Sequence, residues 1–158
     1  MKNIVVIAPH CDDECIGTFE IITNEETPPI ILYDPSNSEE RRQEALNLKK
    51  YTKITKQMFV QSIPQILIDP KTIFYFPHPI YETHPEHRRW GFMGEQLLRQ
   101  GFNVIFYTTL MNAPFIYECK KSKEKEELLN KIYPSQRSLW EYEKKYTLFS
   151  GYCQWLIK

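Results

Sequence analysis

The chain has 158 residues, about the size of one domain and enough to bury a substantial core. Hydrophobic residues make up 42% and charged residues 25%, which excludes a largely disordered chain. Lysine and arginine total 20, as do aspartate and glutamate, so binding of nucleic acid through overall charge is excluded as well.

Apolar runs in the sequence are too short for a membrane span, because none reaches about 18 residues. The apolar run 4–8 is also too short for a secretory leader, and acidic residues follow it closely. We therefore expect a cytoplasmic protein without a membrane span. In that compartment the four cysteines, at 11, 15, 119 and 153, are expected to be reduced thiols rather than disulfides.

Short β-branched or aromatic runs alternate with amphipathic segments along the chain. Strands are predicted at 4–8, 30–33, 58–60, 73–76 and 103–107. Helices are predicted at 13–22, 38–51, 85–100 and 120–131, with a last one from Ser135 toward Trp155. This alternation predicts a single α/β domain over residues 1–158, with a mostly parallel sheet flanked by helices. Such sheets bind ligands at the carboxyl ends of their strands, where the strand order reverses.

Two segments rich in histidine and acidic residues each follow a predicted strand. Residues 8–14, after the first strand, are APHCDDE, and residues 84–87, after the strand at 73–76, are HPEH. Three of the chain's four histidines lie in these two segments. Each segment alone has a simpler interpretation, as surface histidines or as the acidic first turn of a helix. Together, at the ends of two strands, they favour a metal site.

The residue types in these segments suit a hydrolytic zinc site, which uses about three protein ligands and leaves one position for water. His10, Asp13 and His87 satisfy that count, since His10 and Asp13 lie three residues apart and a turn can direct both to one point. Asp12 is then the candidate general base that passes a proton to the leaving amine. His84 is the candidate donor to the developing oxyanion.

Residues 9–17, PHCDDECIG, resemble the PHPDDExxG signature of the PIG-L/LmbE-type zinc-dependent N-deacetylases. The HPEH at 84–87 resembles their HPDH motif, the RRQE at 41–44 their RxxE pair, and the serine and glutamine at 135–136 their SQ stretch. These matches occur in the family's order over about residues 2–136. The resemblance implies a Rossmann-like sheet and removal of an N-acetyl group from an N-acetylglucosamine-type sugar, with Zn²⁺ as the metal. The sequence leaves Fe²⁺ open as the alternative metal.

The resemblance also implies roles, carried over by position in this sequence. The residues that match the family's metal ligands are His10, Asp13 and His87. The residues that match its catalytic groups are Asp12 as base and acid, His84 for the oxyanion and Glu86 as the carboxylate that orients His84. Arg41 matches a residue that contacts the substrate.

Departures from the family pattern keep two alternatives open. Cys11 stands where the family has proline, which places a thiol that could compete as a ligand beside the metal. The chain is also short, which reduces the loops that shape a substrate pocket, so a non-catalytic metal- and sugar-binding module is one alternative. The other is a deacylase that acts on a modified nucleoside or nucleic acid, which a basic patch of the lysines at 49–56 and 120–125 would suit.

Overall fold

The computed structural model describes residues 3–24, 26–110, 117–138 and 149–153. Its helices and strands, in chain order, are β1 (Ile4–Ala8), α1 (Asp13–Ile22), β2 (Ile30–Tyr33), α2 (Glu39–Leu46), β3 (Lys56–Phe59), β4 (Ile73–Pro77), α3 (Pro85–Arg99), β5 (Asn103–Thr108), β6 (Tyr117–Glu118), α4 (Ser122–Ile132) and β7 (Phe149–Cys153). Short 3-10 helices lie at Asn47–Lys50, Gln65–Leu67 and Pro134–Gln136.

The strands form one sheet in the order β3-β2-β1-β4-β5-β7-β6. The five strands from β3 to β5 are parallel, which confirms the predicted α/β fold with a mostly parallel sheet. The chain first builds outward from β1 through β2 to β3, then crosses to the other side of β1 to form β4. The strand order therefore reverses between β1 and β4, where a sheet of this kind binds its ligand.

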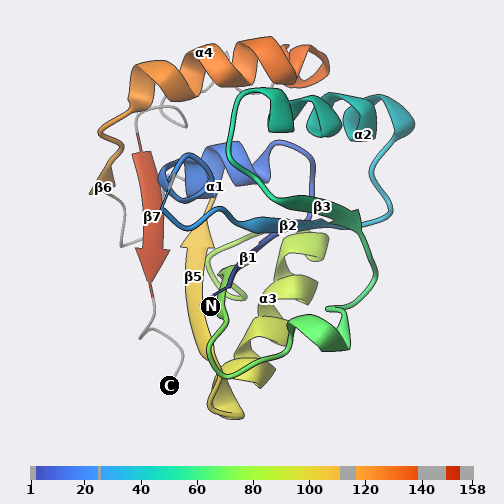
Figure 1. Cartoon of the computed structure of the whole chain (residues 1–158), viewed down its shortest axis with the longest axis vertical. Helices are drawn as coiled ribbons and strands as arrows, with labels where there is room; N and C mark the ends of the chain where they lie inside the picture. Colours follow the sequence, from blue (N-terminus) through green and yellow to red (C-terminus); the bar gives the residue numbers. More distant parts are fainter. Residues whose placement is uncertain (1–2, 25, 111–116, 139–148, 154–158) are drawn as a thin grey trace.

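Helices cover both faces of the sheet, with α1, α2 and α4 on one face and α3 on the other (Figure 1). Side chains of β1 alternate between the two resulting cores, as the period of two in a strand requires. Val5 and Ile7 pack in the core that contains Trp90 of α3. Val6 and Ala8 pack in the core on the side of α1. Because β1 is buried on both faces, its sequence is continuously apolar.

Close packing of α3 on β4 depends on two glycines. A Cβ at Gly91 would lie 2.6 Å from the carbonyl oxygen of Pro77, and one at Gly94 would lie 2.6 Å from the ring of Phe76. Without these side chains the helix can approach the carboxyl end of β4, which fixes the position of its first turn. None of the helices in the described part of the chain is long and apolar enough to cross a membrane.

The prediction of one last helix from Ser135 toward Trp155 was wrong for residues 149–153, which form the strand β7. Pro134–Gln136 is a short 3-10 helix and residues 137–138 are helical, while residues 139–148 and Trp155 lie outside the described residues. β7 runs antiparallel to β5 and supplies the hydrogen-bonding partner that β5 would otherwise lack. This pairing joins segments more than 40 residues apart, so local helical spacing carries no signal of it.

Candidate metal centre

Two loops meet at the carboxyl ends of β1 and β4. The first follows Ala8 and leads into α1, and the second follows Pro77 and leads into α3. His10 and Asp13 come from the first loop and the helix start after it, and His87 comes from the first turn of α3. Within the part of the chain that the structure describes, these three residues are the only group of three or more histidine, cysteine or acidic side chains arranged to hold a metal ion.

The ligand atoms of the three side chains converge on one point. Nδ1 of His10 lies 3.1 Å from Nε2 of His87 and 3.7 Å from Oδ2 of Asp13, and Nε2 of His87 lies 2.8 Å from the same Oδ2. Ligands about 2.0–2.1 Å from a tetrahedral zinc ion are about 3.3 Å from one another. The spacing and the donor set, two histidines and one carboxylate, therefore fit a hydrolytic zinc ion with small side-chain movements.

A tight turn brings His10 and Asp13 together. Oδ2 of Asp13 accepts a hydrogen bond from the backbone N–H of His10 at 2.8 Å, and the backbone N–H of Asp13 donates to the carbonyl oxygen of His10 at 3.2 Å. Asp12, inside this turn, has a φ of 130°. Aspartate and asparagine are enriched among non-glycine residues with positive φ, so the sequence supplies a suitable residue there. The turn directs both ligand side chains to the same side.

Burial and charge give the two histidine ligands different protonation states. Burial is the main cause that lowers the pKa of His10 to about 4, so its imidazole is neutral at pH 7 and has a lone pair for a metal. Burial alone would also lower the pKa of His87, but the carboxylates of Asp13 and Glu82 outweigh it and raise that pKa to about 10. Without a metal, a proton between His87 and Asp13 thus holds the pair together.

We expect Zn²⁺ binding at pH 6 to release about one proton per ion, because the metal must displace the proton on His87 while His10 is already neutral. A zinc-bound water, with a pKa of about 7, adds little at that pH. Affinity should consequently fall about tenfold for each pH unit between pH 7 and 5. Isothermal titration calorimetry in two buffers with different heats of ionisation measures the released protons. Binding without proton release would contradict the protonated His87–Asp13 pair.

Asp12 precedes Asp13, one of the three candidate ligands, and is buried. Burial, and next the neighbouring Asp13, raise the pKa of Asp12, while Arg41 opposes them. Nη2 of Arg41 lies 3.2 Å from Oδ1 of Asp12 and also donates to the carbonyl oxygen of Cys11 at 3.0 Å. Arg41 therefore reaches from α2 to the loop that carries His10 and Asp13, where it fixes the carboxyl group that the sequence suggests as general base.

His84 is the N-cap residue of α3 and lies at the exposed side of the cluster. Its ring is perpendicular to that of His10, with the ring centroids 4.3 Å apart. Nδ1 of His84 accepts a hydrogen bond from the backbone N–H of Glu86 at 3.2 Å. In a neutral ring the proton is then on Nε2, which leaves an N–H donor available to a ligand.

The one contact between Glu86 and His84 in the structure is the hydrogen bond from the Glu86 backbone N–H; the Glu86 carboxylate does not contact His84. Oε2 of its carboxylate lies 3.3 Å from Nε of Arg89. The carboxylate that contacts a candidate ligand is instead Glu82, whose Oε2 lies 3.2 Å from Nδ1 of His87. Sequence analysis missed Glu82, because it lies outside both motifs; its position in the loop between β4 and the HPEH segment is the one signal that could have indicated it.

Cys11 lies in the loop after β1, but its thiol does not belong to the group of ligand atoms. The residue is fully buried, and burial raises the pKa of its thiol, so the sulfur stays protonated at neutral pH. Its backbone N–H donates to Oδ1 of Asn37 at 2.9 Å, which ties the loop to the segment after β2. Cys11, Cys15 and Cys119 are all free cysteines.

The weaker motifs of the sequence also come together. Oε1 of Glu44, the last residue of the RRQE segment, accepts from the backbone N–H of Ser135 at 2.9 Å, and its Oε2 accepts from the Ser135 hydroxyl at 2.6 Å. Helix α2 thus contacts the loop between His10 and Asp13 through Arg41, and the SQ segment through Glu44. These contacts give the two motifs a structural role beside any catalytic one.

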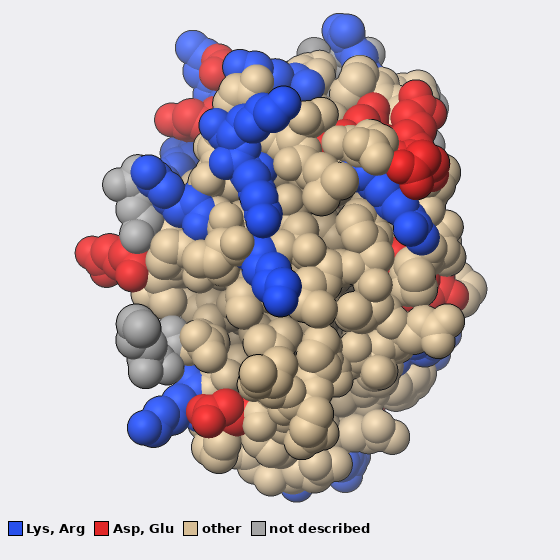
Figure 2. Space-filling model, turned by 45° about the vertical axis from the view of Figure 1, so that its right-hand side comes forward, with Lys and Arg blue, Asp and Glu red and all other residues tan. Residues whose placement is uncertain are grey.

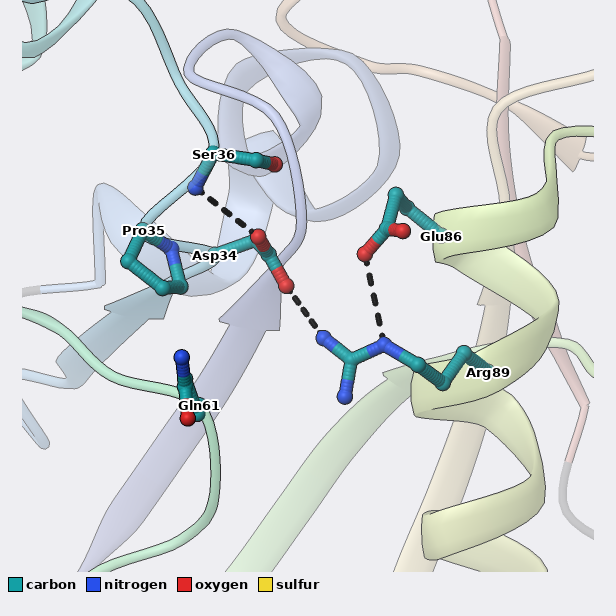
Figure 3. Close-up of a pocket in the computed structure, with 6 residues that line it drawn as sticks. All are labelled: Asp34, Pro35, Ser36, Gln61, Glu86 and Arg89. Atoms are coloured by element: carbon teal, nitrogen blue, oxygen red, sulfur yellow. Dashed lines mark hydrogen bonds and ion pairs between the residues drawn. The ribbon is translucent and has the colours of Figure 1, made fainter.

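A polar pocket of about 620 Å³ is lined in part by Glu86, in the same first turn of α3 as His87, although no residue of the cluster lines it (Figure 3). Its lining residues come from the ends of β2 and β3 and from the first turns of α3: Asp34, Pro35, Ser36, Gln61, Glu86 and Arg89. The guanidinium of Arg89 lies between the carboxylates of Asp34 and Glu86 and forms an ion pair with each. Nε1 of Trp90 also donates to Asp34 at 3.0 Å, so a buried indole holds this carboxylate in place.

Comparison of the chain with family models, with curated proteins and with solved structures finds no match.

Proposed function

We propose that this protein is a metal-dependent hydrolase that removes an N-acyl group, acetyl in the simplest case, from an amino-sugar-type substrate similar to N-acetylglucosamine. The observation that carries the proposal is the convergence of His10, Asp13 and His87 on one point, with a buried carboxyl group and an exposed histidine beside it. Two histidines and one carboxylate are a donor set of hydrolytic zinc sites. The similarity of both motifs to those of the PIG-L/LmbE-type deacetylases supports the same activity.

The ion held by these three ligands, Zn²⁺ or Fe²⁺, would lower the pKa of water and polarise the amide carbonyl. Asp12 accepts the proton of the attacking water as the water oxygen bonds to the carbonyl carbon. Nε2–H of His84 donates to the carbonyl oxygen as that oxygen gains negative charge. The C–N bond then breaks, and Asp12 returns the proton to the nitrogen of the leaving amine. The products are the free amine and a carboxylate.

The environment of Asp12 supports this double role. A group that first takes and then returns a proton works best with a pKa near the working pH, and burial raises the pKa of Asp12 in that direction. The contact with Arg41 keeps the carboxyl group in one orientation. A non-catalytic metal- and sugar-binding module has no need of such a group, which favours the enzyme over that alternative.

The polar pocket lined by Glu86 and Arg89 supports a hydroxylated substrate. Its carboxylates and the amide of Gln61 are acceptors for sugar hydroxyls, and Arg89 and Ser36 are donors. A nucleic-acid substrate has less support. Figure 2 shows one side of the molecule, on which Lys and Arg side chains gather in the upper part, at the height of α2 and α4 in Figure 1, with acidic side chains among them and a mostly uncharged surface below. A polymeric phosphate backbone is better matched by a continuous basic surface.

The proposal is tested by release of amine from a panel of N-acetylated compounds by the Zn²⁺-loaded and the Fe²⁺-loaded protein. The panel contains N-acetylglucosamine, its glycosides, nucleotide sugars and N-acetylated nucleosides. We expect amine and acetate in equal amounts from an N-acetylated sugar, loss of turnover with a chelator and recovery when the metal is restored. If only the N-acetylated nucleosides are hydrolysed, the substrate is an acylated nucleobase rather than an amino sugar. A metal-loaded protein that releases amine from none of them would overturn the proposed hydrolysis.

A further inference from the structure

The buried carboxylate of Glu82, which belongs to neither motif of the sequence, lies beside His87 of the candidate metal centre. Glu82 is 2% exposed, and its Oε2 lies 3.2 Å from Nδ1 of His87, at the ring nitrogen that does not face the cluster. This is an ion-pair distance, at which the ring N–H is not aligned for a regular hydrogen bond. The other ring nitrogen, Nε2, is the one that faces Asp13 and His10. The imidazole of His87 therefore lies between a carboxylate on its outer side and the proposed metal position on its inner side.

Residues that directly follow two strands hold Glu82 in this position, one through its carboxylate and the other through the loop before it. Its Oε1 accepts a hydrogen bond from the backbone N–H of Thr109, directly after β5, and the Thr109 hydroxyl lies 3.1 Å from each carboxylate oxygen. His78, directly after β4, fixes the loop that leads to Glu82, because its Nδ1 accepts from the backbone N–H groups of Ile80 at 3.1 Å and Tyr81 at 3.2 Å. The carboxylate is thus positioned by the rigid sheet rather than by an exposed loop alone.

We infer that Glu82 is a positioning residue that sets the tautomer and the orientation of His87 for metal binding. A carboxylate beside Nδ1 keeps the ring proton on that nitrogen, so the lone pair of Nε2 is directed at the metal. The chain from Thr109 through Glu82 to His87 then makes the ligand both more basic and less mobile. This inference rests on the metal site of the proposed function and does not depend on which bond the enzyme hydrolyses.

The test compares Zn²⁺ affinity, measured by competition with a chelating dye, in the wild type, Glu82→Gln and Glu95→Gln. Glu95 is a matched control, because its carboxylate on α3 pairs with Arg99 at 2.6 Å and is not among the contacts of His10, Asp13 or His87. We expect Glu82→Gln to bind Zn²⁺ about 10–100-fold more weakly and Glu95→Gln to bind it like the wild type. The visible spectrum of the Co²⁺-loaded Glu82→Gln protein should change too, since a purely structural role would leave the ligand field unaltered.

Thr109→Val tests the same series of contacts, from Thr109 through Glu82 to His87, without changing the carboxylate itself. It removes one hydroxyl and keeps the shape of the side chain and the backbone N–H, so we expect a smaller loss of affinity in the same direction. A folded Glu82→Gln protein with wild-type affinity and an unchanged Co²⁺ spectrum would overturn the role of Glu82 and leave the proposed metal site intact; if that variant fails to fold, wild-type affinity in Thr109→Val has the same meaning. A wild-type chain that binds no metal would overturn both.

Discussion

Replacing His87 by alanine is expected to weaken Zn²⁺ binding by more than about 100-fold, a larger loss than removal of a residue that only supports a ligand. The wild type should contain about one zinc or iron ion per chain, and the variant almost none. Only His10 and Asp13 remain of the three converging side chains, and Nε2 of His87 is the ligand atom nearest to Asp13, at 2.8 Å. Elemental analysis of protein purified without chelator or affinity histidines measures the bound metal directly.

Glu86→Gln is the matched control for His87→Ala. Glu86 precedes His87 in the same turn of α3, but its carboxylate contacts Arg89 rather than the cluster. We expect this variant to keep its metal. Thermal unfolding of the metal-free proteins separates loss of a ligand from loss of the fold. Equal metal content in His87→Ala and the wild type would show that His87 is not a metal ligand. His10 and Asp13 would then lack the third protein ligand that the proposed site requires.

Asp12→Asn should keep the metal and lose nearly all turnover. General base catalysis contributes about 10²–10⁴-fold to the rate, and an amide cannot accept the proton of water. Asparagine is nearly the same size as aspartate and tolerates the positive φ of 130° at this position, so the turn between His10 and Asp13 should persist. The measurement is kcat for amine release from an N-acetylated sugar, together with metal content, in the wild type and the variant.

Asp69→Asn serves as the control for Asp12→Asn, because Asp69 is an exposed carboxylate in the turn before β4. Its kcat should equal that of the wild type. A wild-type kcat in Asp12→Asn would exclude Asp12 as the base. Loss of the metal together with turnover would mean instead that Asp12 acts on the metal site, either as a ligand or by shaping the turn.

The sequence alone was sufficient to predict the parallel part of the fold and the three residues of the cluster. The apolar runs of β1 and β2 are short, continuous and bounded by turn residues, so their period and length indicate buried strands. His10, Asp13 and His87 follow two such strands, and the carboxyl ends of neighbouring parallel strands meet at one edge of the sheet. The local hydrophobic pattern and this rule of sheet topology were therefore enough to predict that residues distant in the sequence meet at one site.

Only the tertiary structure decided which charged groups support that site. Glu86 and Glu82 lie in the same loop and helix start, and their spacing gives no reason to prefer one over the other. The choice follows from side-chain direction: Glu86 points to Arg89 at the polar pocket, while Thr109 at the end of β5 holds Glu82 against His87. The strand β7 is a similar case, since its partner β5 is distant in sequence. Contacts of this kind depend on where the packed sheet places each backbone segment, which no local spacing encodes.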